Sequence, residues 1–181
     1  MDFVFITNFI PLHRLLINIH ILILYKMKKR ISAGLLMYRI KNGTLEVLLA
    51  HPGGPYFAKK DEGHWSIPKG EPDIEEDLLV TAMREFHEET GLIPTGDFVP
   101  LSSISQKGGK EVHAWAFEFD FPPGFVHECN EIEIEWPPRS GKFIEFPEID
   151  RIEFFNASDA KKKIKDTQIP FIERLTEILN H

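Results

Sequence analysis

Apolar positions along this chain follow two different periods, and the change from one to the other predicts the elements. Residues 31–39 and 45–51 are short, mostly apolar runs that favour β-strands, and Asn42-Gly43 between them is a typical tight-turn pair. Over residues 77–90 the apolar positions instead recur every three or four residues, which predicts a helix. We therefore expect a hairpin followed by an amphipathic helix.

The second half of the chain predicts two more strands and a final helix. Residues 111–120 have apolar side chains on both alternating faces, which is typical of a central strand. Residues 151–155 predict a last strand, and residues 158–180 predict a helix that is kinked at Pro170. The stretch 129–146 between them is acidic and proline-rich, and Trp136-Pro-Pro-Arg-Ser-Gly141 within it is interpreted as a loop.

The helix predicted over residues 77–90 has suitable residues at both ends. Asp77 or Asp73 can accept hydrogen bonds from the amides of its first turn. Gly91 can adopt the left-handed conformation that ends a helix, and Pro94 follows shortly after it. One face of this helix is apolar and is expected to pack against the sheet.

Another face of the same helix is acidic. At about 100° per residue, Glu85, Glu88 and Glu89 fall within an arc of roughly 100°, and we expect them to face outward. Three neighbouring carboxylates repel one another unless a cation lies among them. Oxygen ligands without His or Cys favour magnesium, manganese or calcium over zinc. The spacing therefore predicts a divalent cation site.

Three further residues are expected to support this site. Glu76 lies in the preceding loop, eight residues before Arg84, and the pair can join loop and helix through two parallel hydrogen bonds. We interpret that pair as structural. Gly70 shapes the same loop, and the backbone carbonyl near Lys69 and Gly70 is a further candidate oxygen ligand.

Taken together, these residues resemble the signature of the Nudix hydrolases. That signature is Gly, five residues, Glu, seven residues, then Arg-Glu-apolar-any-Glu-Glu-any-Gly-apolar, and residues 70–92 meet every position, Gly91 included. The flanking pattern extends the likeness over about residues 28–179. The resemblance implies an α/β fold, a Nudix-type α/β/α sandwich with a mixed β-sheet. It also implies an enzyme that hydrolyses nucleoside diphosphates linked to another group, with Mg²⁺ or Mn²⁺.

By the same resemblance, Glu85, Glu88 and Glu89 are the metal ligands and catalytic carboxylates. A further carboxylate from a later loop is expected near them as a candidate base. Our choice is Glu148, which stands six residues before Phe154 of the predicted last strand. The alternatives are three residues of the adjacent acidic stretch: Glu131, Glu133 and Glu135.

Cationic and aromatic residues near the signature are candidates for binding the substrate. Lys69 is the strongest of them because its neighbour, Gly70, belongs to the signature. The predicted substrate-binding residues are Lys69, His51, Tyr56, Trp65, Lys110 and Arg139, with Lys107, His64, Trp115 and Trp136 as further candidates.

Composition and charge narrow the class of protein. The chain has 181 residues, 43% hydrophobic and 27% charged, which is ordinary for one soluble globular domain. A net charge of −7 argues against a nucleic-acid polymer as partner. The single Cys129 excludes an intrachain disulfide and fits a reducing compartment, so we expect a cytoplasmic protein. The resemblance implies that it is an enzyme with a small-molecule nucleotide substrate.

Residues 1–26 differ in composition from the rest of the chain, since they contain no Gly, Ala or Glu. Their longest apolar run, residues 15–25, is broken by Asn18 and His20 and is too short to span a membrane. They also lack the basic start and small-residue cleavage site of a signal peptide. We therefore predict a Nudix domain over residues 27–181, preceded by an extension that lies outside the domain. An interfacial helix or membrane anchor is the alternative.

The substrate is the least constrained prediction. Residues 65–70, Trp-Ser-Ile-Pro-Lys-Gly, resemble the family members that hydrolyse dinucleoside polyphosphates or nucleoside triphosphates, and we favour these substrates. A diphosphoinositol polyphosphate is an alternative, but its many phosphates call for a more basic surface than a net charge of −7. A catalytically inactive nucleotide sensor is an alternative function. Such proteins usually lack a signature carboxylate, whereas this chain keeps all the carboxylates of the signature.

Overall fold

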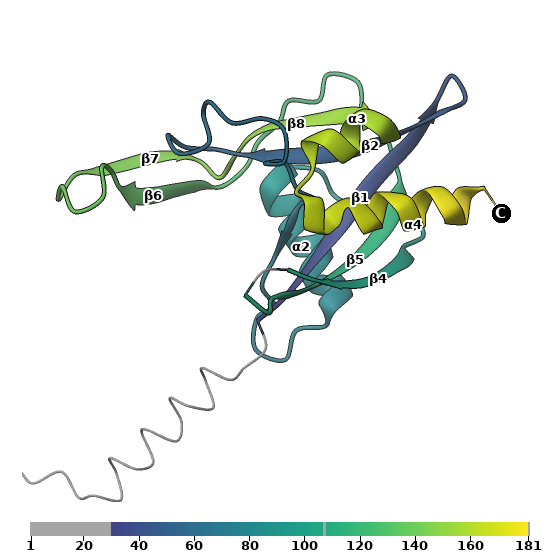
Figure 1. The fold of residues 1–181 in the computed structure, drawn as a ribbon, viewed down its shortest axis with the longest axis horizontal. Coiled ribbons are helices and arrows are strands. Elements are labelled where there is room, and N and C mark those ends of the chain that lie inside the picture. The colour runs from purple at the N-terminus through teal and green to yellow at the C-terminus, as the bar shows by residue number, and fades with distance from the viewer. Residues whose placement is uncertain (1–29, 107, 181) are drawn as a thin grey trace, which may run out of the picture.

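The computed structural model describes residues 30–106 and 108–180. The extension predicted over residues 1–26 lies outside these described residues, as does Lys107. Six strands form the main sheet (Figure 1): β1 (Ile31–Lys41), β2 (Thr44–Pro52), β3 (Lys69–Gly70), β4 (Val99–Ser105), β5 (Glu111–Glu118) and β8 (Ile149–Asn156). No helix within the described residues is long and apolar enough to span a membrane.

The main sheet is mixed, as predicted. Its order is β4-β5-β1-β2-β8, with β3 added to the beginning of β1. Strands β1 and β5 are parallel, whereas the remaining pairs are antiparallel. The predicted hairpin is confirmed: Lys41 pairs with Thr44, and both Asn42 and Gly43 have the positive φ that a two-residue turn of this type needs.

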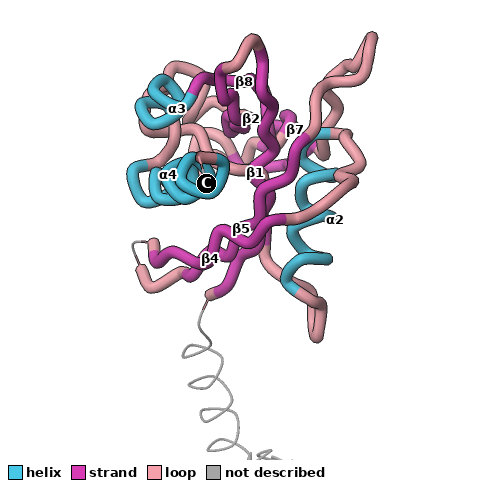
Figure 2. The backbone as a smooth tube through the Cα atoms, turned by 90° about the vertical axis from the view of Figure 1, so that its right-hand side faces the viewer, coloured by secondary structure: helices cyan, strands magenta, loops and turns pink. Residues whose placement is uncertain are grey.

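Helices cover both faces of the sheet, which confirms the predicted three-layer sandwich (Figure 2). On one face lies α2 (Leu78–Thr90), which buries Ala82 and Phe86 against Leu35 and Phe117. On the other lie α3 (Ala157–Lys163) and α4 (Ile169–Leu179). Each fully buried side chain such as Phe86 contributes about 2–3 kcal/mol of hydrophobic stabilisation, so α2 is anchored firmly to the sheet.

The ends of α2 follow from its sequence. The Asp77 carboxylate accepts hydrogen bonds from the amides of Leu79 (2.8 Å) and Val80 (3.3 Å), so Asp77 rather than Asp73 is the N-cap. At the other end Gly91 has a φ of 76° and donates its N–H to the carbonyl of His87 at 2.8 Å. Both boundaries of the helix are therefore set locally.

The predicted single C-terminal helix with a kink at Pro170 is wrong. The chain forms two separate helices, α3 and α4, joined by a 3-10 turn, η1 (Asp166–Gln168). Pro170 lies in the first turn of α4, where its missing N–H removes no helical hydrogen bond. A proline at this point of the sequence therefore begins a helix instead of bending one.

Residues 129–146 contain strands that the sequence did not predict, and the loop interpreted at residues 136–141 is confirmed as the connection between them. They include β6 (Glu131–Glu135) and the start of β7 (Phe143–Pro147), which form a separate two-stranded sheet that extends away from the sandwich (Figure 1). Ile134 pairs with Ile144, and Glu133 pairs with Glu145. The alternation of Ile and Glu is the period of a strand, but the density of charge and proline concealed it.

Candidate active site

The loop that leads into α2, residues 63–77, is attached to the centre of the sheet; we call it the signature loop because its second half belongs to the signature. Ser66 and Ala50 exchange two backbone hydrogen bonds of 2.9 and 3.0 Å, and Leu35 donates its N–H to the carbonyl of Pro68 at 3.1 Å. Gly70 then pairs with Ala33 of β1. These contacts place the predicted signature loop on rigid strands, at the edge from which α2 begins.

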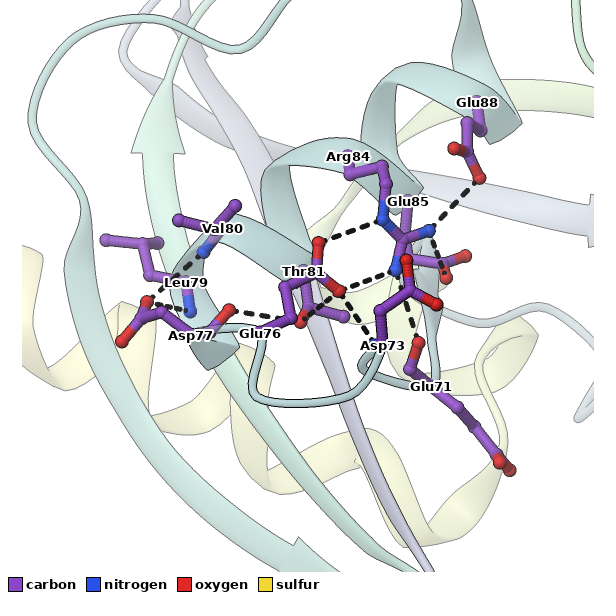
Figure 3. A network of polar contacts seen from close by, with 10 residues as sticks. All are labelled: Glu71, Asp73, Glu76, Asp77, Leu79, Val80, Thr81, Arg84, Glu85 and Glu88. Carbon is purple, nitrogen blue, oxygen red and sulfur yellow. Dashed lines mark hydrogen bonds and ion pairs between the residues drawn. The ribbon is translucent and has the colours of Figure 1, made fainter.

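Glu76 and Arg84 form the two-bonded pair expected from their spacing (Figure 3). Arg84 Nε and Nη2 donate to the two Glu76 carboxylate oxygens at 3.0 and 2.9 Å. Glu76 also accepts hydrogen bonds from the Thr81 hydroxyl at 2.9 Å and the Asp73 amide at 3.0 Å. The bonds from Arg84 are the main reason that the pKa of Glu76 falls to about 2. Loop and helix are thus held together around one permanently charged carboxylate.

The same guanidinium also reaches the acidic face of α2. Its Nη1 donates to Glu85 Oε1 at 2.8 Å and lies 3.3 Å from Glu88 Oε2 (Figure 3). Arg84, which is also paired with Glu76, is therefore a cation that these two carboxylates share. Within residues 30–106 and 108–180, no three His, Cys, Asp or Glu side chains are already arranged around a common metal position.

The three glutamates of this face differ in burial. The Glu88 side chain is 39% exposed and that of Glu85 is 16% exposed, but Glu89 is only 7% exposed. The expectation that all three face outward is therefore wrong for Glu89, because the signature loop covers it. The Glu89 carboxylate accepts a hydrogen bond of 3.3 Å from the Lys69 amide, which is a further contact between that loop and the helix.

The pKa of Glu89 is raised to about 8, chiefly by burial and in smaller part by the nearby charges of Glu148 and Glu85. The ammonium of Lys69 acts in the opposite direction. Burial likewise raises the pKa of Glu85, although Arg84 lowers it. Both carboxylates therefore lie where a charge is poorly compensated by the protein alone.

Gly70 has a steric role in this arrangement. A Cβ atom at Gly70 would overlap the carboxylate of Glu85, so any other residue forces that side chain to move. Gly70 does not have a positive φ, so its identity is required by the space beside Glu85 and not by the backbone conformation. Gly91, in contrast, is needed for its left-handed conformation.

Glu148 lies within electrostatic reach of the glutamates of α2, and its charge raises the pKa of both Glu85 and Glu89. Its backbone is fixed: its N–H donates to the Asn130 carbonyl at 2.9 Å, and its carbonyl accepts from Gly53 at 2.8 Å. Asn130 in turn donates its N–H to the carbonyl of Glu88 at 3.3 Å. One residue thus links the Glu148 loop to the end of α2. The alternatives Glu131, Glu133 and Glu135 belong to β6 of the separate hairpin.

Two of the predicted substrate-binding side chains are core residues. His51 is fully buried and bonds to Asp150 at 2.6 Å and to the Lys60 carbonyl at 2.8 Å. Trp65 is 1% exposed, and its indole N–H donates to Asp61 at 2.8 Å. Neither side chain has a surface on which a nucleotide can lie, because neighbouring elements cover both of them.

The other predicted contacts are spread over the molecule. Tyr56 is exposed, with the Lys60 ammonium 3.3 Å from its ring centre. Arg139 lies in the turn of the hairpin that extends away from the sandwich (Figure 1), so it is not brought together with α2. Lys110 lies beside the signature loop and pairs with Glu71 at 3.1 Å.

The structure adds one cation that the sequence did not single out, Lys165. Its charge interacts with those of Lys69, Lys110 and Glu89, which places it beside the candidate site. Burial, and after it the charge of Lys69, lowers the pKa of Lys165. In the sequence it follows the run Lys161–Lys163 after a single isoleucine, and such a lysine-rich stretch is more often a solvated surface. Lys165 differs from the other lysines of this stretch because it lies in the connection between α3 and α4, beside the candidate site.

The sequence matches the model of the NUDIX domain over residues 28–175, which is most of the chain. The chain belongs to the Nudix family. This membership confirms the predicted resemblance and fold, and it supports the predicted class of enzyme, a pyrophosphohydrolase. No curated protein matches the chain by sequence.

Solved structures show the same Nudix fold at low sequence identity. An Ap4A hydrolase binary complex from C. elegans is 22% identical, with a TM-score of 0.57 over 83% of this chain and 98% of that one. The NUDIX domain of Shewanella oneidensis NrtR, complexed with ADP ribose, is 15% identical, with a TM-score of 0.58 over 83% and 88%. A mutT/nudix family protein from Listeria innocua is 18% identical, with a TM-score of 0.54 over 83% and 94%.

Proposed function

We propose that this Nudix protein hydrolyses a phosphoanhydride bond in a nucleoside diphosphate-linked compound, in a reaction that requires Mg²⁺ or Mn²⁺. The favoured substrate is a dinucleoside polyphosphate or a nucleoside triphosphate. The observation that carries the proposal is the group of poorly compensated carboxylates at one end of α2: Glu85 and Glu89 are largely buried, and both are repelled by Glu148. Such an arrangement is costly unless the carboxylates bind a cation.

The donor set fits a hard divalent cation. Glu85, Glu88 and Glu89 offer carboxylate oxygens, which are the ligands that magnesium and manganese prefer. Two of the three have raised pKa values, so a bound cation removes a penalty that the protein otherwise carries. When bound, the ion neutralises phosphate oxygens and makes a water molecule more acidic.

The protein's own residues then have separate tasks. Arg84 keeps Glu76 and the signature loop in place, and its bonds to Glu85 and Glu88 hold these side chains at the mouth of the site. We assign Glu148 the role of base, because it is the carboxylate brought near the acidic face from another part of the chain. Positioning and electrostatics supply most of the rate in phosphoryl transfer, so a rigid loop and helix are what the reaction needs.

A substrate panel tests this proposal. Diadenosine tetraphosphate, ATP, ADP ribose and a diphosphoinositol polyphosphate are incubated with the protein and Mn²⁺ or Mg²⁺, and products are identified by mass spectrometry. Hydrolysis in ¹⁸O-labelled water then shows which phosphorus atom receives the oxygen. We expect turnover of the dinucleoside polyphosphate or the triphosphate that disappears with EDTA. Tight nucleotide binding without turnover of any compound would instead favour the inactive sensor.

A further inference from the structure

The connection between α3 and α4 runs alongside the beginning of the signature loop. Gly63 donates its N–H to the Lys162 carbonyl at 2.9 Å, and Trp65 donates to the Lys163 carbonyl at 3.1 Å. Lys165 completes the pairing by donating to the Trp65 carbonyl at 2.9 Å. The backbone of Lys165 is therefore fixed beside Trp65, which lies only a few residues before Lys69 in the signature loop. Lys165 and Lys69 themselves are far apart in the sequence.

A cavity of about 350 Å³ opens beside this pairing. It is lined by residues from three separate parts of the chain: Gly63, Gln106, Lys165, Asp166 and Thr167. Gln106 comes from the turn between β4 and β5, and its backbone is held by a 2.8 Å hydrogen bond from its N–H to the Lys110 carbonyl. The size is at the lower end for small-molecule sites, enough for a phosphate group with its adjacent linkage.

The cavity and its surroundings contain hydrogen-bond donors without partners. The side-chain amide nitrogen of Gln106 is buried and has no hydrogen-bond partner among the described residues. The same holds for Gln168, a fully buried residue whose side-chain oxygen accepts from the Ile67 amide at 3.0 Å. A buried donor without a partner costs about 1–3 kcal/mol, so such donors usually have a ligand or water to bind.

Cations also gather at this position. The ammonium of Lys165 is largely removed from solvent and is repelled by those of Lys69 and Lys110, which lowers its pKa, while Glu89 attracts it. Asp166 contributes a carboxylate to the lining, and Lys110 is paired with Glu71. Even so, bringing three ammonium groups together is unfavourable without a further anion among them.

We propose that this cavity binds a phosphate group of the substrate, next to the phosphates at the α2 glutamates, with Lys165 as its principal cation and Gln106 as a hydrogen-bond donor. The proposal rests on the proposed function, since it assigns the cavity to the same substrate. Ammonium and amide N–H groups only donate hydrogen bonds, which matches a phosphate, whose oxygens only accept. A third or fourth phosphate in the substrate would then improve binding.

The test uses tripolyphosphate as an anion without a nucleoside, and adenosine as a nucleoside without charge. Binding of each is measured by calorimetry on the full chain in EDTA, so that no metal contributes. The variants are Lys165→Gln, Lys165→Arg and Gln106→Leu, with Lys142→Gln, on the exposed hairpin turn, as a control with the same loss of charge. Thermal unfolding establishes that each variant is folded.

We expect the wild type and Lys142→Gln to bind tripolyphosphate equally, and Lys165→Gln to bind it about tenfold more weakly or worse, as for the loss of one charged hydrogen bond. Lys165→Arg should stay within about threefold of the wild type, and Gln106→Leu should lose about fivefold. Unchanged tripolyphosphate affinity in Lys165→Gln overturns the proposal. A wild type that binds no tripolyphosphate also overturns it. So does a Lys165→Gln variant that loses only its binding of adenosine.

Hydrolysis assays separate this inference from the proposed function. If no nucleotide is hydrolysed but tripolyphosphate binding depends on Lys165, the anion site stands and the enzymatic function fails. If hydrolysis is observed and Lys165→Gln changes neither KM nor tripolyphosphate affinity, the function stands and the anion site fails. For an anion site we expect KM to rise about tenfold and kcat to change by less than about threefold.

Discussion

Replacing Glu89 by Gln removes one buried ionisable carboxyl group and little else. The two side chains have nearly the same size, and the Gln oxygen can still accept the hydrogen bond that the Lys69 amide donates at 3.3 Å. The fold should therefore survive the change because the size and the hydrogen bond are kept. Exposure is not the reason, since Glu89 is only 7% exposed. The variant tests whether this carboxylate is kept for the sake of a bound cation.

The expected magnitude follows from the pKa of Glu89, which is raised from 4.5 to about 8. An acid with a raised pKa favours folding in its protonated form, so its contribution to stability is complete below about pH 4.5 and is lost as the pH rises through about 8. At about 1.4 kcal/mol per pH unit, this loss is about 5 kcal/mol at most. Between pH 5 and 8 the metal-free wild type should therefore lose a few kcal/mol relative to the variant, several degrees in Tm.

The assay is thermal unfolding in EDTA from pH 5 to 8.5, with Glu177→Gln on the exposed side of α4 as the matched control. Manganese at pH 8, in buffer without EDTA, should then raise the Tm of the wild type and the control, but hardly that of Glu89→Gln. Turnover of the variant should fall about a thousandfold, as when another electrostatic stabiliser is removed. A stability difference that does not change between pH 5 and 8, or turnover within tenfold of the wild type, would refute the reasoning.

Three further substitutions separate the support of the site from its chemistry. In Gly70→Ala the new Cβ displaces the flexible Glu85 carboxylate. We expect the stability to change by no more than about 1 kcal/mol and the manganese affinity, measured by calorimetry, to fall. An unaltered affinity would contradict the steric role of Gly70. Glu76→Gln weakens the bonds to Arg84 and should cost about 2 kcal/mol in urea unfolding, with a milder loss of rate than Glu89→Gln. If Glu76→Gln is instead the more damaging to turnover at saturating metal, the roles are reversed. Glu148→Gln should lower kcat at least a hundredfold with little change in KM, whereas an unchanged kcat would assign the base elsewhere.

Local sequence determined those parts of the molecule whose stability depends on neighbouring residues. The turn at Asn42-Gly43 and the helix from Asp77 to Gly91 were predictable because φ preferences and capping hydrogen bonds act within a few residues. The signature spacing likewise placed the glutamates on one face of α2 and Arg84 within reach of Glu76, eight residues earlier. The family followed from the same residues.

Where charge or proline dominates a segment, local patterns were less informative. The strands β6 and β7 were missed because glutamates and prolines obscured a two-residue period. Pro170 was assigned a kink because the sequence alone does not say whether a proline interrupts a helix or begins one. The turn η1 separates α3 from α4, so Pro170 begins a helix. That turn is held by a distant part of the chain, since Gln168 accepts a hydrogen bond from the Ile67 amide.

Only the tertiary structure decided how deeply each carboxylate is buried and which charges surround it. The sequence put Glu88 and Glu89 on the same face of a helix, but the loop that packs over one of them makes their electrostatics different. Glu148 and Lys165 reach the site from the last third of the chain, through backbone hydrogen bonds to Asn130 and Trp65. Helical spacing is a property of neighbours along the chain, whereas desolvation and charge proximity depend on every segment that packs nearby.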